Sequence, residues 1–101
     1  MEKDLRYTEL FELYKALLTE RQRDIFSCHY CLDLSLSEIA EPDGNTRQSV
    51  YSAIKTVKSK LDEYEKVLGL YSKNQKLIAL AEKVKDRDGS LSQQILEIVG
   101  K

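Results

Sequence analysis

The sequence has few of the residues that interrupt helices. Its 101 residues include one proline, four glycines, two cysteines and no tryptophan. Because proline and glycine mark most turns, their scarcity favours long helices over many short strands. Two cysteines are also too few for the disulfide scaffold of a small secreted protein.

Long apolar runs are absent as well. No run approaches the roughly 20 residues that a membrane-spanning helix needs, and the N-terminus "MEKDLRYTEL" has no signal-peptide core. The sequence therefore predicts a cytoplasmic protein that does not use a membrane. Hydrophobic residues make up 42% of the chain, which allows one modest core. We expect a single all-helical domain over residues 1–101.

Apolar residues recur at steps of three and four in the first third of the chain, which is the spacing of helices with one buried face. This pattern predicts one helix over residues 3–18 and another over residues 19–32. Thr19 and Gln22 fit a capping box at the start of the second helix. The second helix is expected to bury Ile25, Phe26 and either Tyr30 or Leu32.

A short helix, a turn and a long helix are predicted next. Ser35 and Glu38 form a second capping box, which begins a helix over residues 36–41 with Leu36, Ile39 and Ala40 in the core. Pro42 and Gly44 predict a turn. Thr46 then caps a helix that continues to Gly69. Its apolar stripe is longer than a compact three-helix unit needs, so its second half should pack on another element. The stripe consists of Val50, Ile54, Val57, Leu61, Tyr64 and Leu68.

Two further helices are expected at the C-terminal end. Ser72 with Gln75 predicts a helix to about Asp86, and Ser90 with Gln93 predicts a last short one. Both are amphipathic. Residues 69–101 could complete the core on the long helix, form a homodimer face or dock a partner. No segment alternates as a strand does, so the predicted fold is all-α.

The short helix, turn and long helix match a helix-turn-helix unit, with residues 17–68 as its core. In such a unit the start of the second helix enters the DNA major groove. The candidates for base edges are Arg47, Gln48, Ser49 and Ser52. The candidates for phosphates are Thr46, Tyr51, Lys55 and Lys58.

Charge is distributed unevenly, although the net charge is only −1. Residues 46–60 hold four bases and no acid, whereas residues 1–45 hold ten acids and five bases. A basic helix on an acidic body is compatible with nucleic-acid contact. It is equally compatible with an ordinary solvated helix face, on which Arg47 and Gln48 only meet water and Tyr51 belongs to the core.

Other motifs point to no chemistry. The stretch "CHYC" from Cys28 to Cys31 lacks the four ligands of structural zinc and the βαβ setting of a redox motif. The alternative for this stretch is a zinc ion or disulfide shared between the two chains of a dimer. His29 has no nucleophile or paired carboxylates to serve as a general base, and no glycine-rich phosphate loop is present. We therefore expect no enzyme activity, metal, cofactor or small-molecule substrate.

Four motifs in order, "LLTERQRDIF", "DLSLSEIAE", "TRQSVYSAIK" and "KLDEYEKVLGL", resemble the YlxM family of small bacterial helix-turn-helix proteins. The resemblance covers roughly residues 17–70. It implies a three-helix DNA-binding core of the winged-helix type without strands, similar to the fourth region of sigma factors. It further implies a cytoplasmic, non-enzymatic homodimer that acts in the signal recognition particle (SRP) pathway by regulating the expression or function of its components.

The turn departs from the family pattern, in which apolar residues stand on both sides of the glycine. Asp43 and Asn45 occupy these two positions, and each lost aliphatic side chain forgoes about 1.5–3 kcal/mol of burial. Pro42 removes a backbone donor and should end the preceding helix early. We expect a looser or rearranged turn, with a changed angle between the two helices. Three roles remain open: a DNA-binding regulator, a protein-interaction module that keeps the helix-turn-helix as architecture, and a binder of SRP RNA.

Overall fold

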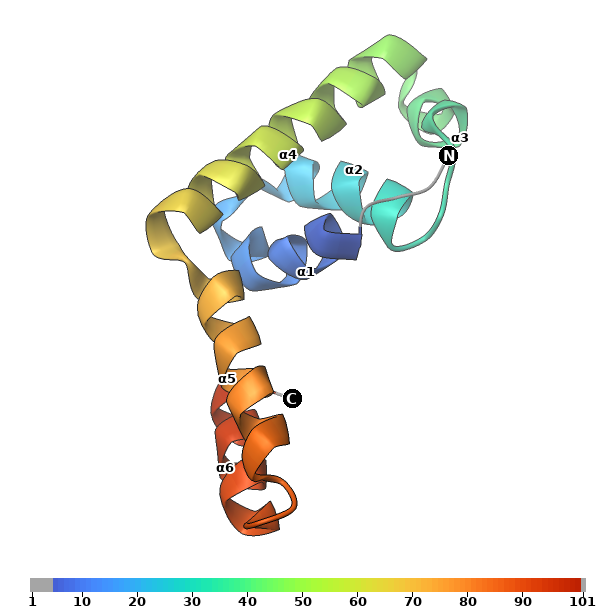
Figure 1. The fold of residues 1–101 in the computed structure, drawn as a ribbon. Helices are drawn as coiled ribbons and strands as arrows, with labels where there is room; N and C mark the ends of the chain where they lie inside the picture. Colours follow the sequence, from blue (N-terminus) through green and yellow to red (C-terminus); the bar gives the residue numbers. More distant parts are fainter. Residues whose placement is uncertain (1–4, 101) are drawn as a thin grey trace. The chain divides into compact units, whose positions relative to one another are not determined.

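The computed structural model describes residues 5–100, and this part of the chain is all-α and without strands (Figure 1), as the sequence predicts. Two short 3₁₀ helices, η1 and η2, connect longer α-helices. The elements in chain order are α1 (Leu5–Tyr14), η1 (Lys15–Leu17), α2 (Glu20–Tyr30), α3 (Leu36–Ala40), η2 (Glu41–Asp43), α4 (Arg47–Leu68), α5 (Leu70–Val84) and α6 (Gly89–Val99).

By backbone contacts the chain divides into two compact units, one ending at Val67 and one beginning at Leu68. The single domain predicted over residues 1–101 stays a prediction, because backbone contacts describe local packing and not cooperative unfolding. Within the described residues 5–100, no helix is both long and apolar enough to cross a bilayer.

The core of the first unit draws on all four of its helices. At its centre the Phe26 ring stacks on Tyr30, with centroids 4.3 Å apart, and lies 5.0 Å from the Phe11 ring. Ile25 and Phe26 are buried as predicted, while Tyr30 is half-buried and Leu32 is exposed. Among the residues of this unit that the structure describes, the buried apolar side chains are Leu10, Phe11, Tyr14, Leu18, Ile25, Phe26, Ala40, Val50, Ile54, Val57 and Leu61.

The second half of α4 packs on α1 (Figure 1). Its long apolar stripe predicted that this half would pack on a further element. Asp62 accepts hydrogen bonds from Arg6 Nη1 at 3.1 Å and from Tyr7 Oη at 2.7 Å. One turn later, Glu65 accepts a bond of 2.7 Å from Tyr14 Oη. Because α1 precedes the helix-turn-helix in sequence, these bonds fix α4 to a part of the chain outside residues 17–68.

The capping boxes predicted for α2 and α3 are both confirmed. Thr19 Oγ1 accepts the Gln22 N–H at 3.2 Å, and the Gln22 side chain accepts the Thr19 N–H at 2.9 Å. Ser35 and Glu38 make the same reciprocal pair at 3.1 and 3.0 Å. Each box satisfies two of the backbone donors that a helix start leaves unpaired.

The capping boxes predicted for the last two helices are wrong. Gly69 has a positive φ of 64°, which lets α5 begin at Leu70 directly after α4, so Ser72 already lies inside the helix. For α6 the cap is Asp88, whose Oδ1 accepts the Leu91 N–H at 3.0 Å. Ser90 is therefore helical too, because an aspartate two residues earlier takes the capping position.

In the second unit, α5 and α6 lie side by side and antiparallel (Figure 1). Among its described residues, only Ala81 and Ser92 are buried, and Ser92 Oγ donates a 2.8 Å hydrogen bond to the Ala81 carbonyl oxygen. Leu80, Leu91 and Ile98 are exposed. Most apolar side chains of this pair of helices are thus half-buried or exposed.

Candidate nucleic-acid interface

The turn between α3 and α4 is closed by backbone hydrogen bonds. Gly44 adopts the left-handed conformation with φ 68°, and its N–H donates to the Glu41 carbonyl at 3.1 Å. The Asn45 N–H donates to the Ala40 carbonyl at 3.0 Å. These two bonds are those of a Schellman motif, in which a left-handed glycine ends a helix and satisfies its last carbonyls.

The expectation of a loose turn is therefore wrong for the backbone. Pro42 lies at the start of η2, where a fixed φ and a missing donor are tolerated, and α3 ends before it at Ala40. Asp43 is exposed and Asn45 is half-buried. The polar residues are accommodated because the turn is held by Gly44 and by main-chain bonds and not by two buried side chains.

The first turns of α4 separate anchoring residues from presented ones. Thr46 Oγ1 accepts the Ser49 N–H at 3.0 Å, so Thr46 is the predicted N-cap. Val50 and Ile54 are only 1% and 4% exposed and fix the helix to the core. Seven of the eight candidate residues are exposed around this anchor: Thr46, Arg47, Gln48, Ser49, Tyr51, Ser52 and Lys55.

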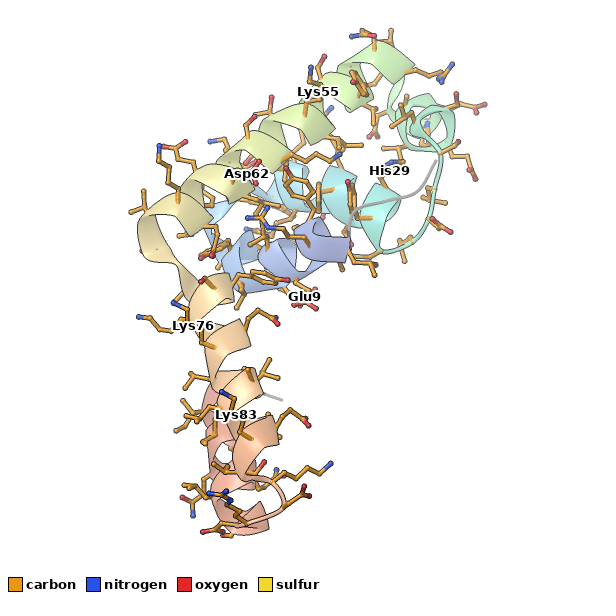
Figure 2. All side chains as sticks on the ribbon, in the orientation of Figure 1. Glu9, His29, Lys55, Asp62, Lys76 and Lys83 are labelled. Carbon is orange, nitrogen blue, oxygen red and sulfur yellow. The ribbon has the colours of Figure 1, made fainter. Side chains whose placement is uncertain are left out.

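Lys58, the eighth candidate, is half-buried. Its Nζ lies 5.3 Å from the centroid of the Tyr7 ring and 5.4 Å from that of the Tyr30 ring. The Nζ of Lys55 lies 5.6 Å from the ring of Tyr51, which is itself exposed; Figure 2 labels Lys55 on the first half of α4. The two lysines therefore differ: Lys58 connects α4 to α1 and α2, whereas Lys55 stays within the first half of α4.

Replacing each lysine by methionine should separate these roles. Lys58→Met removes two cation–π contacts, which are worth about 0.5–2 kcal/mol, and we expect a lower midpoint in urea with a smaller loss of nucleic-acid affinity than for Lys55→Met. Lys55→Met should leave the midpoint within about 0.5 kcal/mol of the parent and weaken binding. Denaturation and binding titrations on both variants measure this. A binding loss for Lys58→Met as large as that for Lys55→Met would show that Lys58 contacts phosphate as Lys55 does.

An open depression lies between the start of α3 and the first turns of α4. It is lined by Leu36, Arg47, Gln48 and Tyr51. Sequence reasoning assigned Leu36 to the core, but this side chain is only half-buried. The available signal was its place directly after the cap Ser35, where a helix is least covered by its neighbours.

Acidic side chains occupy α3 and η2 beside this surface. Glu38 accepts the Ser35 N–H, and this bond, with that of the Ser35 hydroxyl, lowers the pKa of the Glu38 carboxyl below its usual value. The lowered pKa favours the ionised form of this carboxylate in the cap. Glu41 and Asp43 are exposed. Around this turn, the acidic residues thus lie on α3 and η2 and the basic ones on α4.

The end of α2 holds the "CHYC" stretch. Cys28 is half-buried and Cys31 is exposed, both as free thiols, and His29 Nδ1 lies 2.8 Å from the Leu34 carbonyl oxygen (Figure 2). Over residues 5–100, no three His, Cys, Asp or Glu side chains are grouped so that they could hold a metal ion.

Comparison with known proteins connects this geometry to a family. The model of the UPF0122 family, described as "Putative helix-turn-helix protein, YlxM / p13 like", matches residues 1–99. This chain belongs to the UPF0122 family. The membership confirms the resemblance to YlxM and the helix-turn-helix fold, and it extends the match from the predicted residues 17–70 to almost the whole chain.

Individual UPF0122 proteins support the assignment. The chain is 44% identical over 87 residues to a UPF0122 protein of Caldanaerobacter subterraneus subsp. tengcongensis, covering 85% of this chain and 74% of that protein. A UPF0122 protein of a Geobacillus species is 44% identical over 86 residues, covering 85% and 78% of the two chains. One of Bacillus cereus is 37% identical over 102 residues, covering 98% and 93%. The UPF0122 pattern thus includes α1, α5 and α6 as well as the helix-turn-helix.

Proposed function

We propose that the protein is a non-enzymatic, DNA-binding regulator that reads duplex DNA with the first half of α4. The observation that carries this proposal is the exposed, acid-free start of α4 after a closed helix-turn-helix turn. Residues 46–60 hold four bases and no acid, and the bonds around Gly44 hold the end of α3 in place. A basic helix held in this way matches the major groove in size and charge.

The exposed residues divide by chemistry into two groups. Arg47 can donate two hydrogen bonds to guanine, Gln48 can pair with adenine, and Ser49 and Ser52 can meet either base edge. The N-terminus of α4, capped by Thr46, favours a phosphate because its amides and helix dipole are positive. Tyr51 and Lys55 can contact the backbone beyond it. These phosphate contacts would set register and salt dependence without specifying sequence.

The biological context of the proposal comes from the resemblance to YlxM. It supports a cytoplasmic protein that regulates the expression or function of SRP components. It also supports a homodimer, in which two reading helices would meet a two-fold symmetric site. The exposed Leu80, Leu91 and Ile98 of α5 and α6 offer apolar surface for such a face, and sedimentation at several concentrations tests it.

The same exposed side chains favour a second candidate function. An apolar surface on α5 and α6 suits a protein-interaction module, in which the helix-turn-helix is architecture only. This candidate predicts that partner binding survives loss of Arg47 and Lys55.

The double variant Arg47→Ala, Lys55→Ala tests the leading proposal. We expect the affinity for duplex DNA to fall by tenfold or more, because a bidentate arginine alone is worth about 1–3 kcal/mol. The slope of log affinity against log salt should decrease by about one, because Lys55 is the phosphate contact that is lost and Arg47 is the base reader. Fluorescence anisotropy with pooled genomic duplexes across a salt series measures both, with SRP RNA as a parallel titration.

The matched control is the double variant Lys76→Ala, Lys83→Ala, which also removes two positive charges, but from exposed positions on α5 (Figure 2). It should retain the parent's slope and most of its affinity. Equal losses in both double variants would point to a diffuse charge effect and contradict a reading helix. No binding to duplex or RNA at low salt would refute the nucleic-acid role and leave the protein-interaction module, tested by pull-down.

A further inference from the structure

The depression between α3 and α4 combines two kinds of surface in one place. Leu36 and the Tyr51 ring supply apolar atoms, while Arg47 and Gln48 supply hydrogen-bond donors. Leu36 is half-buried and Tyr51 is 44% exposed, so both side chains can be reached from solvent. The depression is therefore suited to a ligand that has polar groups along one edge and an apolar group next to them.

The major groove of DNA presents one apolar group, the 5-methyl of thymine, next to acceptors and donors on the base edges. We propose that this depression receives a thymine 5-methyl group of duplex DNA, beside a base pair whose edge is read by Arg47 or Gln48. This inference rests on the proposed function and specifies its ligand. Tyr51 thereby contacts a base in place of the phosphate first assigned to it.

Charge complementarity selects DNA over an apolar protein segment as the occupant. Arg47 lines the depression itself, and the flanking residues 46–60 contain no acid. The N-terminus of the 22-residue helix α4 also lies beside the depression, and it adds the positive partial charge of the helix dipole. A purely apolar side chain would offer the exposed Arg47 and Gln48 no acceptor, whereas a base edge accepts hydrogen bonds from them directly.

The same geometry argues against RNA as the ligand of this depression. Uracil lacks the 5-methyl group, so RNA offers nothing apolar at the corresponding point. The major groove of an A-form helix is also too narrow for side chains to read. The depression therefore discriminates between the two nucleic acids at the level of one methyl group.

Thymine-to-deoxyuridine replacement tests the proposal on the protein as it stands. A tight-binding duplex is first selected from random sequence, and each thymine in it is then replaced singly by deoxyuridine. We expect one position per helix-turn-helix at which affinity falls about fourfold, the equivalent of about 0.8 kcal/mol for one buried methyl group. The other replacements should change affinity by less than twofold.

Variants assign the effect to the depression. Tyr51→Ala and Leu36→Ala should each bring the thymine-to-deoxyuridine ratio close to one, whatever they do to affinity overall. Lys55→Ala is the control, which should weaken binding to both duplexes and keep the ratio. Circular dichroism verifies that each variant is folded. Two variants of the depression are used so that the test still holds if one of them fails to fold.

The outcomes separate this inference from the proposed function. If every deoxyuridine duplex binds as tightly as its thymine parent, or the selected sites contain no preferred thymine, the inference is overturned while duplex binding through Arg47 stands. A fourfold loss that persists in both depression variants also overturns it. Binding to RNA with no binding to duplex would overturn the inference and the DNA-binding function together.

Discussion

Replacing Leu61 by alanine is expected to lower the free energy of unfolding by about 2–5 kcal/mol, the usual cost of truncating a fully buried leucine. Leu61 is 0% exposed and lies in the half of α4 that is bonded to α1 through Asp62 and Glu65. A small domain has about 5–15 kcal/mol in total, so the folded population itself is at risk. Urea denaturation followed by circular dichroism measures the change.

Val67→Ala is the control for this prediction. Val67 is on the same helix but 75% exposed, so its truncation should change stability by no more than about 0.5 kcal/mol. If Leu61→Ala and Val67→Ala had equally small effects, the second half of α4 would not be docked on α1 in solution. The affinity of the folded fraction for duplex DNA should be unchanged in both, because neither residue is near Arg47 in the helix.

The largest stability loss is expected for Phe26→Ala, about 3–5 kcal/mol. The Phe26 side chain is 0% exposed and its ring stacks on Tyr30 with an interplanar angle of 8° while also meeting Phe11. Truncation would leave a cavity between α1 and α2 and remove two aromatic contacts. The near-ultraviolet circular dichroism should weaken as the midpoint in urea falls.

Phe26→Leu is the matched variant, because it retains most of the volume and should cost clearly less than Phe26→Ala. Tyr30 also faces the ammonium of Lys58, so Phe26→Ala and Lys58→Met are expected to be non-additive. A strictly additive double variant would show that the Tyr30 ring keeps its position without Phe26, so that stacking on Phe26 does not orient it.

The parts of the fold that follow from local chemistry could be predicted from the sequence. The boxes at Thr19 and Ser35 involve residues three apart, and nothing distant competes with them. At the last two helices the same rule chose Ser72 and Ser90. There Gly69, with a positive φ, determines the start of α5, and Asp88 determines the start of α6. The spacing of a serine and a glutamine alone cannot show which of several possible caps a helix uses.

The candidate site divides in the same way. The anchors Val50 and Ile54 follow from helical spacing, so the exposure of Gln48 and Ser52, which lie off this apolar stripe, could be predicted. The position of Lys58 could not, because it depends on α1 and α2 bringing Tyr7 and Tyr30 to α4. Leu36 was missed for the same reason: the depression exists only where two helices that are separated by the turn meet in space.

The order of charges along α4 has a consequence for how the protein meets DNA. After the acid-free residues 46–60 come Asp62, Glu63 and Glu65, with Asp62 further along the helix than Lys55 (Figure 2). In the field of a polyanion, the basic first half of α4 is attracted more strongly than the second half, where Arg6 is paired with Asp62, and this difference exerts a torque on the helix before any contact forms. The molecule would then arrive with the start of α4 leading, and added salt would slow association more than it hastens release.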